Sequence, residues 1–547
     1  MLYKLAGMGA ICAALLLSQE TSTNGSISGT VQDSGTHKPV SGASVADGRQ
    51  SDNITTDANG HFTIKNLAPA TYAIRVYADQ GRGPHGTKVV QLSSGQDATV
   101  NIQLRPNALL SGRVLNENGE PAPEMQVALI AREYRLSALR YVYAYLAETN
   151  DQGQYVIPNV EPGRGFLLLA RNHVQKLDAS ANAPADPQLR NKAIMPTWYP
   201  DSDTLDGAEA LVFEPGERRE NIDLRLQRSA SYCVDGVLAT EAGPSALNFS
   251  LEDHEPTSGR WGDRAMFSMP PSGRSGADGK FRVCNLHPGI YRMTAYRLPE
   301  GDGRQSNVFF ADSEVIIDDE DVHNVRVVGL PRVAVAGEVV WDGKPPDQPV
   351  SSKVRVMLQP LTRAYFHQEI EASHMEASVP GSFTLAGLVT DDYSIDVLGT
   401  PEGTYVKDIT YGGLSALHEP MRVGKTMGST LRIVLARDGG TIAVKVADKD
   451  GQPVPDYGVV LLPETANSEA ALADGMITGQ TDQNGTYTSK LIAPGKYFVL
   501  AEANVPDRSP ETIGRLLLAR THAQTVELAA NGQAQAQLAL PESEAVK

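Results

Sequence analysis

The sequence predicts an all-β protein, built as a tandem array of about five seven-stranded β-sandwich domains. First, a motif of the form Asp-x-Asn-Gly-x-aromatic, followed by Pro-Gly-x-Tyr, recurs along the 547 residues. Second, short segments alternate apolar and polar residues with a period of two, which is typical of half-buried strands. Third, 50 glycines and 34 prolines are spread along the chain, which favours many tight turns between short strands.

The motif copies differ in how complete they are. Their first halves are Asp57-x-Asn59-Gly60-x-Phe62, Asp151-x-Gly153-x-Tyr155, Asp278-Gly279-x-Phe281, Gly381-x-Phe383 and Asp482-x-Asn484-Gly485-x-Tyr487. The aromatic residues of their second halves are Tyr72, Phe166, Tyr291, Tyr393 and Tyr497. A spacing of about one hundred residues is too long for a solenoid repeat and fits a small all-β domain.

The first copy shows how one domain is expected to form. Its alternating segments predict strands within residues 25–31, 39–45, 61–67, 72–76, 90–92 and 100–104, with turns between them. Asp and Asn bind their own backbone, and Gly adopts positive φ without steric cost, so we expect residues 57–60 to form a hairpin loop. A calcium loop would need more acidic oxygens than one Asp per copy.

Boundaries follow from the repeats and from the start of the chain. Residues 5–17 are an apolar run after Lys4, too short to cross a bilayer comfortably, so residues 1–22 are expected to be a signal peptide. The five domains are then predicted to span residues 23–105, 106–229, 230–331, 332–437 and 438–547. The short linkers predict a rod, with packed domains as the open alternative. The best helix candidate starts at Ser509.

The first copy resembles a known family. Gly29 to Val31, Gly35 to Val45, Thr56 to Pro69, and Tyr72 together are similar to the carboxypeptidase regulatory-like domain. The resemblance implies a transthyretin-like, Ig-like β-sandwich, related in fold to the B-type repeats of collagen-binding adhesins. It further implies an accessory, stalk or surface module without catalysis or a cofactor of its own.

The expected function is therefore that of an exported, non-catalytic bacterial protein, secreted, periplasmic or on the cell surface, with a structural or adhesive role. Its partner would be a protein or glycan at the cell surface, with no transmembrane span left after signal removal. The formal net charge of −17 repels nucleic acid. Two alternatives stay open, a carbohydrate-binding protein that uses exposed aromatic rings and an accessory subunit of a separate enzyme.

Two side-chain clusters are candidate sites. Tyr141, Tyr143 and Tyr145 alternate with smaller apolar residues, so they would share one outer face and could stack on a ligand. The alternative is that loops or a neighbouring domain cover them. His367, Glu369 and His374 could ligate a metal, although their spacing matches no strong pattern and surface loops often contain such residues.

The cysteines point to one cross-link. Of three in the chain, Cys12 lies in the expected signal peptide, which leaves Cys233 and Cys284. Export makes an oxidising compartment the expected setting, so these two could form a disulfide between two strands of the third domain. Two unpaired thiols are the alternative, because sequence alone does not fix their separation.

Overall fold

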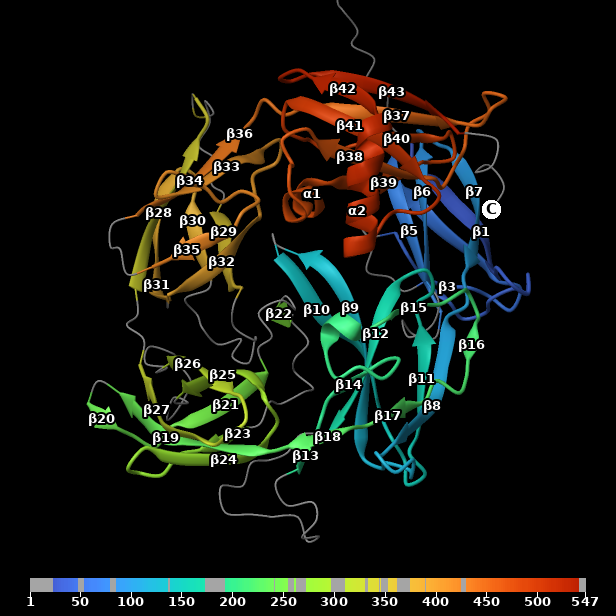
Figure 1. Cartoon of the computed structure of the whole chain (residues 1–547). Coiled ribbons are helices and arrows are strands. Elements are labelled where there is room, and N and C mark those ends of the chain that lie inside the picture. Colours follow the sequence, from blue (N-terminus) through green and yellow to red (C-terminus); the bar gives the residue numbers. More distant parts are fainter. Residues whose placement is uncertain are drawn as a thin grey trace, which may run out of the picture. The chain divides into compact units, whose positions relative to one another are not determined.

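A computed structural model describes residues 23–47, 54–78, 85–135, 138–172, 192–240, 242–253, 260–261, 272–296, 310–329, 333–343, 345, 353–361, 374–388, 390–424 and 429–540 (Figure 1). The chain divides into two compact units, one formed by residues up to 104 and one by residues from 105 onwards. Each is described by itself. The expected signal peptide lies outside the described residues.

The first unit is a sandwich of two sheets. Its strands are β1 (Gly25–Asp33), β2 (Ser44–Ala46), β3 (Ile54–Thr55), β4 (His61–Leu67), β5 (Ala70–Tyr77), β6 (His85–Leu92) and β7 (Asp97–Leu104). One sheet has the order β4-β1-β7 and the other β3-β2-β5-β6. Strand β1 pairs antiparallel with β4 and parallel with β7. Alternate side chains such as Ile27, Ile74 and Ile102 fill the core between the sheets.

The second domain keeps this plan and adds strands. Its elements are β8 (Ala108–Leu115), β9 (Met125–Arg135), β10 (Ala138–Glu148), β11 (Gln154–Val160), β12 (Gly165–Asn172), β13 (Lys192–Ile194), β14 (Thr197–Trp198), the 3-10 helix η3 (Leu205–Gly207), β15 (Ala210–Val212), β16 (Arg218–Arg219), β17 (Leu224–Arg225) and β18 (Arg228–Ala230). Strand β8 lies between β11 and the pair β16 and β17, while β9 lies between β10 and β12. Strands β13 and β18 pair with each other.

The third domain has the same two sheets. Its strands are β19 (Tyr232–Thr240), β20 (Gly243–Pro244), β21 (Asn248–Asp253), β22 (Arg260–Trp261), β23 (Ser272–Arg274), β24 (Lys280–Leu286), β25 (Gly289–Tyr296), β26 (Phe310–Ile317) and β27 (Val322–Val328). Strand β19 pairs with β24 and β27, and the second sheet has the order β23-β21-β25-β26. Strand β22 leaves this domain and pairs parallel with β10 of the second.

The fourth domain repeats the plan with one added hairpin. Its strands are β28 (Val333–Trp341), β29 (Lys353–Pro360), β30 (His374–Ser378), β31 (Gly381–Leu388), β32 (Asp391–Leu398), β33 (Tyr405–Tyr411), β34 (Leu414–Ser415), β35 (Met421–Val423) and β36 (Leu431–Ala436). The sheets have the orders β31-β28-β36-β33-β34 and β30-β29-β32-β35. The hairpin β33–β34 therefore extends the first sheet beyond β36.

The fifth domain adds helices instead. It contains β37 (Thr441–Ala447), β38 (Gly458–Pro463), α1 (Glu469–Gly475), β39 (Ile477–Gln480), β40 (Thr486–Thr488), β41 (Gly495–Glu502), α2 (Pro510–Ala519), η6 (Arg520–His522), β42 (Gln524–Leu528) and β43 (Gln533–Ala539). Helix α2 confirms the expected start, because the Ser509 hydroxyl accepts the N–H of Thr512 and Pro510 occupies the first turn. No described helix is both long and apolar enough to cross a membrane.

In all five domains the first strand pairs parallel with the last. The pairs are β1–β7, β8–β16 and β17, β19–β27, β28–β36, and β37–β43. Four of the five first strands carry a glycine opposite the motif's aromatic residue, at Gly29, Gly112, Gly236 and Gly337. In the first three of these, an added Cβ would lie 1.8–1.9 Å from a carbonyl oxygen of the last strand or of the segment that leads into it. Glycine is therefore required because another backbone fills the place of the side chain.

The Asp-x-Asn-Gly turn joins the two sheets, so the expectation of a hairpin loop is wrong. Strand β3 before it pairs with β2, whereas β4 after it pairs with β1 in the other sheet. The turn chemistry itself is as expected. The Asp57 carboxylate accepts the N–H groups of Asn59 and His61 at 2.8 and 2.9 Å, and Gly60 has φ of 75°. In the second domain Asn150, rather than Asp151, is the acceptor.

Two further motif residues hold the sandwich together through hydrogen bonds. A buried hydroxyl four residues before the motif glycine bridges a donor and an acceptor near the second strand. Thr481, for example, accepts the N–H of Tyr457 at 2.9 Å and donates to the carbonyl of Val454 at 2.8 Å. Equivalent hydroxyls are those of Thr56, Thr149 and Ser275.

The tyrosine of the second half-motif closes the turn that precedes it. The hydroxyls of Tyr72, Tyr291 and Tyr497 each donate to the carbonyl four residues earlier, at 2.7, 2.9 and 2.7 Å. Their rings are buried in the domain cores. Burial raises the pKa of Tyr497 to about 12, so its hydroxyl stays a proton donor. The motif therefore encodes a corner between sheets.

The close approach at Gly29 gives a stability prediction. In residues 23–105 expressed alone, Gly29→Ala should lower the free energy of unfolding by about 1–3 kcal/mol, because the new methyl group displaces the last strand. Urea unfolding measures this. Ser28→Ala, at the neighbouring position of β1, is the matched control and should change little. Equal stability of the two variants would contradict the proposed role of the glycine.

The turn at Asp57 gives a pH prediction. Its pKa lies below the ordinary value of 3.8, mainly because the N–H groups of His61 and Asn59 bind the carboxylate. A carboxyl group whose pKa is lowered by folding stabilises the folded state at pH values above its ordinary pKa. This stabilisation is lost as the pH falls through the pKa of the folded state. Asp57→Asn keeps an acceptor, as Asn150 does, and should flatten the fall in melting temperature below about pH 4. If Asp57→Asn leaves the fall in melting temperature below about pH 4 unchanged, the prediction is wrong.

Candidate functional site

The tyrosine stripe on β10 is buried rather than exposed. Tyr141 and Tyr143 are each 5% exposed and pack with Trp198, Leu167 and Leu169. The Arg171 guanidinium lies 5.3 Å from the centre of the Tyr143 ring. Binding of a ligand by these tyrosines stays a prediction, and in this structure protein atoms cover both rings.

The third tyrosine faces the other side of the sheet. A register shift between Tyr143 and Tyr145 turns Tyr145 toward the sandwich core, where its ring packs edge-on against Phe166 at 5.7 Å. Its hydroxyl accepts the N–H of Glu161 at 3.0 Å. The expectation that all three tyrosines share one outer face is therefore wrong, because a bulge reverses the alternation.

The cover over the tyrosines comes from the long extension of the second domain. Strand β14 pairs with β12, so Trp198 lies over the outer face of the sheet beside the tyrosines. The helix η3 adds Leu205 to the same cluster. Trp198 therefore helps to close a third layer over β9, β10 and β12.

The metal candidate falls mostly outside the described residues. His367 and Glu369 are not described, and for His374 only the backbone is, paired with Met357 in β29–β30. Across the ranges that the structure describes, three or more His, Cys, Asp or Glu residues gather nowhere in a way that could hold a metal. The metal site therefore stays a prediction.

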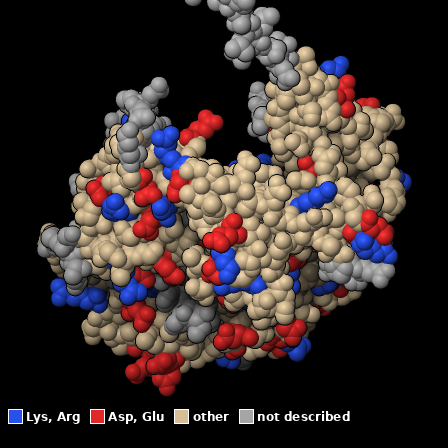
Figure 2. All heavy atoms as spheres, turned by 90° about the horizontal axis from the view of Figure 1, so that it is seen from above, with Lys and Arg blue, Asp and Glu red and all other residues tan. Residues whose placement is uncertain are grey.

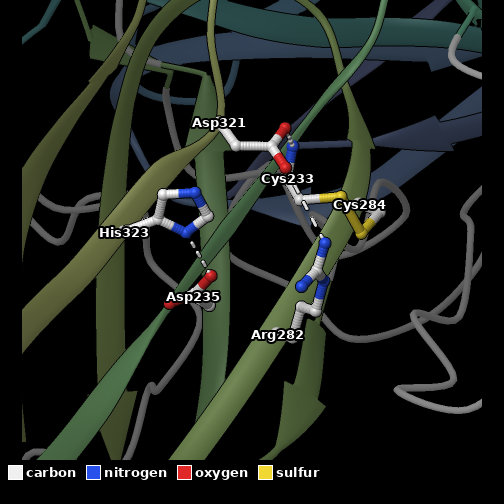
Figure 3. The surroundings of a disulfide bond; sticks show 6 residues. All are labelled: Cys233, Asp235, Arg282, Cys284, Asp321 and His323. Carbon is white, nitrogen blue, oxygen red and sulfur yellow. Dashed lines mark hydrogen bonds and ion pairs between the residues drawn. A yellow bond between two sulfur atoms is a disulfide. The ribbon is translucent and has the colours of Figure 1, made fainter.

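The two cysteines of the third domain form a disulfide (Figure 3). Cys233 on β19 and Cys284 on β24 join adjacent strands and are 51 positions apart in the sequence. The Asp321 carboxylate accepts the N–H of Cys233 at 2.8 Å and lies 3.7 Å from the Arg282 guanidinium. These contacts tie the acidic turn before β27 to the cross-linked pair.

A hydrogen-bonded pair of side chains lies beside the disulfide on the same sheet (Figure 3). Nδ1 of His323 on β27 lies 2.6 Å from the Asp235 carboxylate on β19. This hydrogen bond is the main reason that the pKa of Asp235 lies below its ordinary value. The pair bridges the first and last strands of the domain, so its arrangement supports the sheet.

Sequence reasoning missed a cluster that joins the second and fifth domains. The Tyr134 hydroxyl at the end of β9 donates to the Glu469 carboxylate of α1, and its N–H donates to the carbonyl of Arg508 at 2.7 Å. Arg132 forms an ion pair with Glu511 of α2. These domains are not sequence neighbours, so the contact differs from a rod in which only neighbours touch.

A signal for this cluster is present in the sequence. Residues 127–131 of β9 and 459–462 of β38 are continuous apolar runs, and both runs are buried on both sides of their strands. Such runs indicate strands covered on two faces. The face shown in Figure 2 carries acidic and basic residues interspersed among other residues.

One family model matches part of the chain. Residues 26–105 match the family model of the carboxypeptidase regulatory-like domain. No curated protein gives a significant match to the sequence. Residues 26–105 thus form a carboxypeptidase regulatory-like domain, as the sequence motif predicted.

Several solved structures resemble parts of the chain. The TIE protein of Bacillus anthracis is 10% identical, with a TM-score of 0.17, over 95% of this chain and 69% of that one. A streptococcal ancillary pilin is 9% identical, with a TM-score of 0.19, over 57% and 99%. The minor pilin of Streptococcus agalactiae is 15% identical, with a TM-score of 0.21, over 38% and 95%.

The disulfide gives a stability prediction. Replacing Cys233 and Cys284 together by Ser should lower the free energy of unfolding of the third domain by about 2–5 kcal/mol, because the unfolded segment gains freedom. Hydrogen exchange of β19 and β24 in the full chain, followed through a urea series, measures this domain alone. The first domain, which has no cysteine in its described strands, is the internal control. Unchanged protection would show that the bond is dispensable.

Proposed function

We propose that this chain is an exported, non-catalytic multidomain protein of the bacterial surface or periplasm, with a structural or adhesive role. One observation carries the proposal. The polar motif residues Thr56, Asp57 and Tyr72 bind the backbone of their own domain. Related contacts recur in later domains. The contacts that repeat along the chain are therefore those that fold each β-sandwich. Repeated sandwiches give a protein length and surface area for binding partners.

Two features support export. Residues 5–17 have the length and apolar character of the central part of a signal peptide. The disulfide between Cys233 and Cys284 fits an oxidising compartment, since such bonds rarely persist in a reducing cytosol.

The partner would bind where the domains differ. The second domain carries the extension around β13 to β15, the fourth a β33–β34 hairpin and the fifth two helices. Elaborated loops and additions on a rigid scaffold are where binding surfaces usually lie. A protein or glycan at the cell surface is the proposed class of partner. The buried rings of Tyr141 and Tyr143 give no specific support to sugar stacking.

Protease accessibility tests the location. Cells that make the chain with a carboxyl-terminal epitope are treated with protease intact, after opening of the outer envelope, and after lysis. The epitope should be cleaved before lysis, while a cytoplasmic marker survives. Removal of residues 2–22 is the control and should protect the epitope until lysis. Protection of the complete chain until lysis would contradict export.

Adhesion of the same cells tests the role. Cells that export the complete chain should attach to a host-cell or glycan-coated surface more than cells that export a chain without residues 438–540. Equal attachment, together with an unchanged envelope, would contradict a structural or adhesive role. Turnover of any substrate by the purified chain would contradict the non-catalytic assignment.

A further inference from the structure

The second domain carries a hairpin that projects beyond its sheet. Strand β12 pairs with β9 only from Met125 to Ala131, whereas β10 pairs with β9 as far as Arg135. Residues 132–135 and 138–141 therefore extend as two strands past the edge where β12 ends. Strand β9 has 11 residues, compared with 3 in β2 and 6 in β38 at the equivalent place. The projection is an addition to the common sandwich.

The fifth domain carries a matching addition. Helices α1 and α2 cover the outer face of β38 and β41, where Val460 and Leu462 pack with Leu472, Ile513 and Leu516. The sandwich core on the other face of β38 is a separate cluster that includes Val459, Leu461 and Val499. The helices therefore form a third layer.

The two additions contact each other. The Tyr134 ring packs against the helix cluster, and its hydroxyl and N–H both donate hydrogen bonds to the fifth domain. Arg132 and Glu511 form the ion pair described above. Burial is the main cause that raises the pKa of Tyr134, and the hydrogen bond and negative charge of Glu469 raise it further. The hydroxyl of Tyr134 therefore stays protonated and donates its hydrogen bond.

The contacts differ in how much each one stabilises the joint between the two domains. Glu511 is 58% exposed, so its ion pair is screened by water and contributes little. The Tyr134 ring is different, because it removes apolar surface from water while both of its polar groups keep partners. Tyr134 is therefore the residue on which the contact depends.

We propose that residues 132–135 and 138–141, together with α1 and α2, form a clasp that holds the second and fifth domains as one rigid unit. The third and fourth domains lie between them in the chain, so the clasp closes residues 230–437 into a loop. When the clasp opens, the two domains separate while each sandwich stays folded. This proposal is independent of where the protein is located or what it binds.

Hydrogen exchange of the full chain tests the clasp from the hairpin side. In Tyr134→Ala, peptides of α1 and α2 should exchange on the order of tenfold faster, because the helices lose a cover. Peptides of β38 and of residues 125–131 should exchange as in the wild type. Glu148→Ala, an exposed position at the other end of β10, is the matched control. Unchanged exchange of both helices in Tyr134→Ala would overturn the proposal.

A second variant tests the clasp from the helix side. Glu469→Ala leaves the second domain intact, and peptides of residues 132–141 should exchange faster. This variant decides the question if Tyr134→Ala also disturbs residues 125–131. Unchanged exchange of the hairpin in Glu469→Ala would then overturn the clasp.

Cross-linking identifies which segment the hairpin contacts, and whether that segment belongs to the same chain. A benzoylphenylalanine at position 134 should form a bond to residues 469–475 or 505–519 of the same chain, identified by mass spectrometry of a mixture of light and heavy isotope-labelled protein. Bonds between light and heavy chains would show that the hairpin docks on a second copy, and no bond at all would show that the contact does not form. Either result would overturn an intramolecular clasp.

Discussion

The parallel pairing of first and last strands is the constraint on which each sandwich depends. The first strand lies between the motif strand and the last strand, so this sheet is complete only when the last strand of the domain has paired. Such a contact joins the two ends of about eighty residues, and its loop-closure entropy must be offset by the core that it seals. A side chain at Gly29 or Gly236 would block this approach, which explains why both positions are glycine.

The sequence predicts the strands and turns of this fold because both are local, but it does not show which strands pair. Asp57 and Gly60 indicate a tight turn from their own chemistry, whereas the sheet that each flanking strand joins depends on residues far away. Asn150 shows the same limit. The motif aligns Asp151 with Asp57, but in the structure it is Asn150 whose side chain accepts the turn's backbone hydrogen bonds. The disulfide joins two strands whose adjacency is likewise non-local.

The tyrosine stripe shows why site prediction was harder than fold prediction. Alternation along β10 holds through Tyr143, and a bulge then reverses it at Tyr145, which no composition rule reveals. The cover over Tyr141 and Tyr143 comes from residues 197–208, more than fifty residues later in the chain. Whether an aromatic face is exposed depends on such distant segments. An exposed stripe and a buried third layer therefore look alike in the sequence.

The apolar runs of β9 and β38 explain the third layers that the structure describes in the second and fifth domains. In β29 of the fourth domain, buried and more exposed positions alternate, so its outer face can meet water. Residues 127–131 and 459–462 instead place apolar side chains on both faces, and the outer face would be a large hydrophobic patch without a cover. The extension over β9 and the helices over β38 remove that patch. With both third layers in place, the projecting hairpin of the second domain meets the helices of the fifth domain, and Tyr134 lies at this contact. The clasp thus follows from how two sheets bury their second faces.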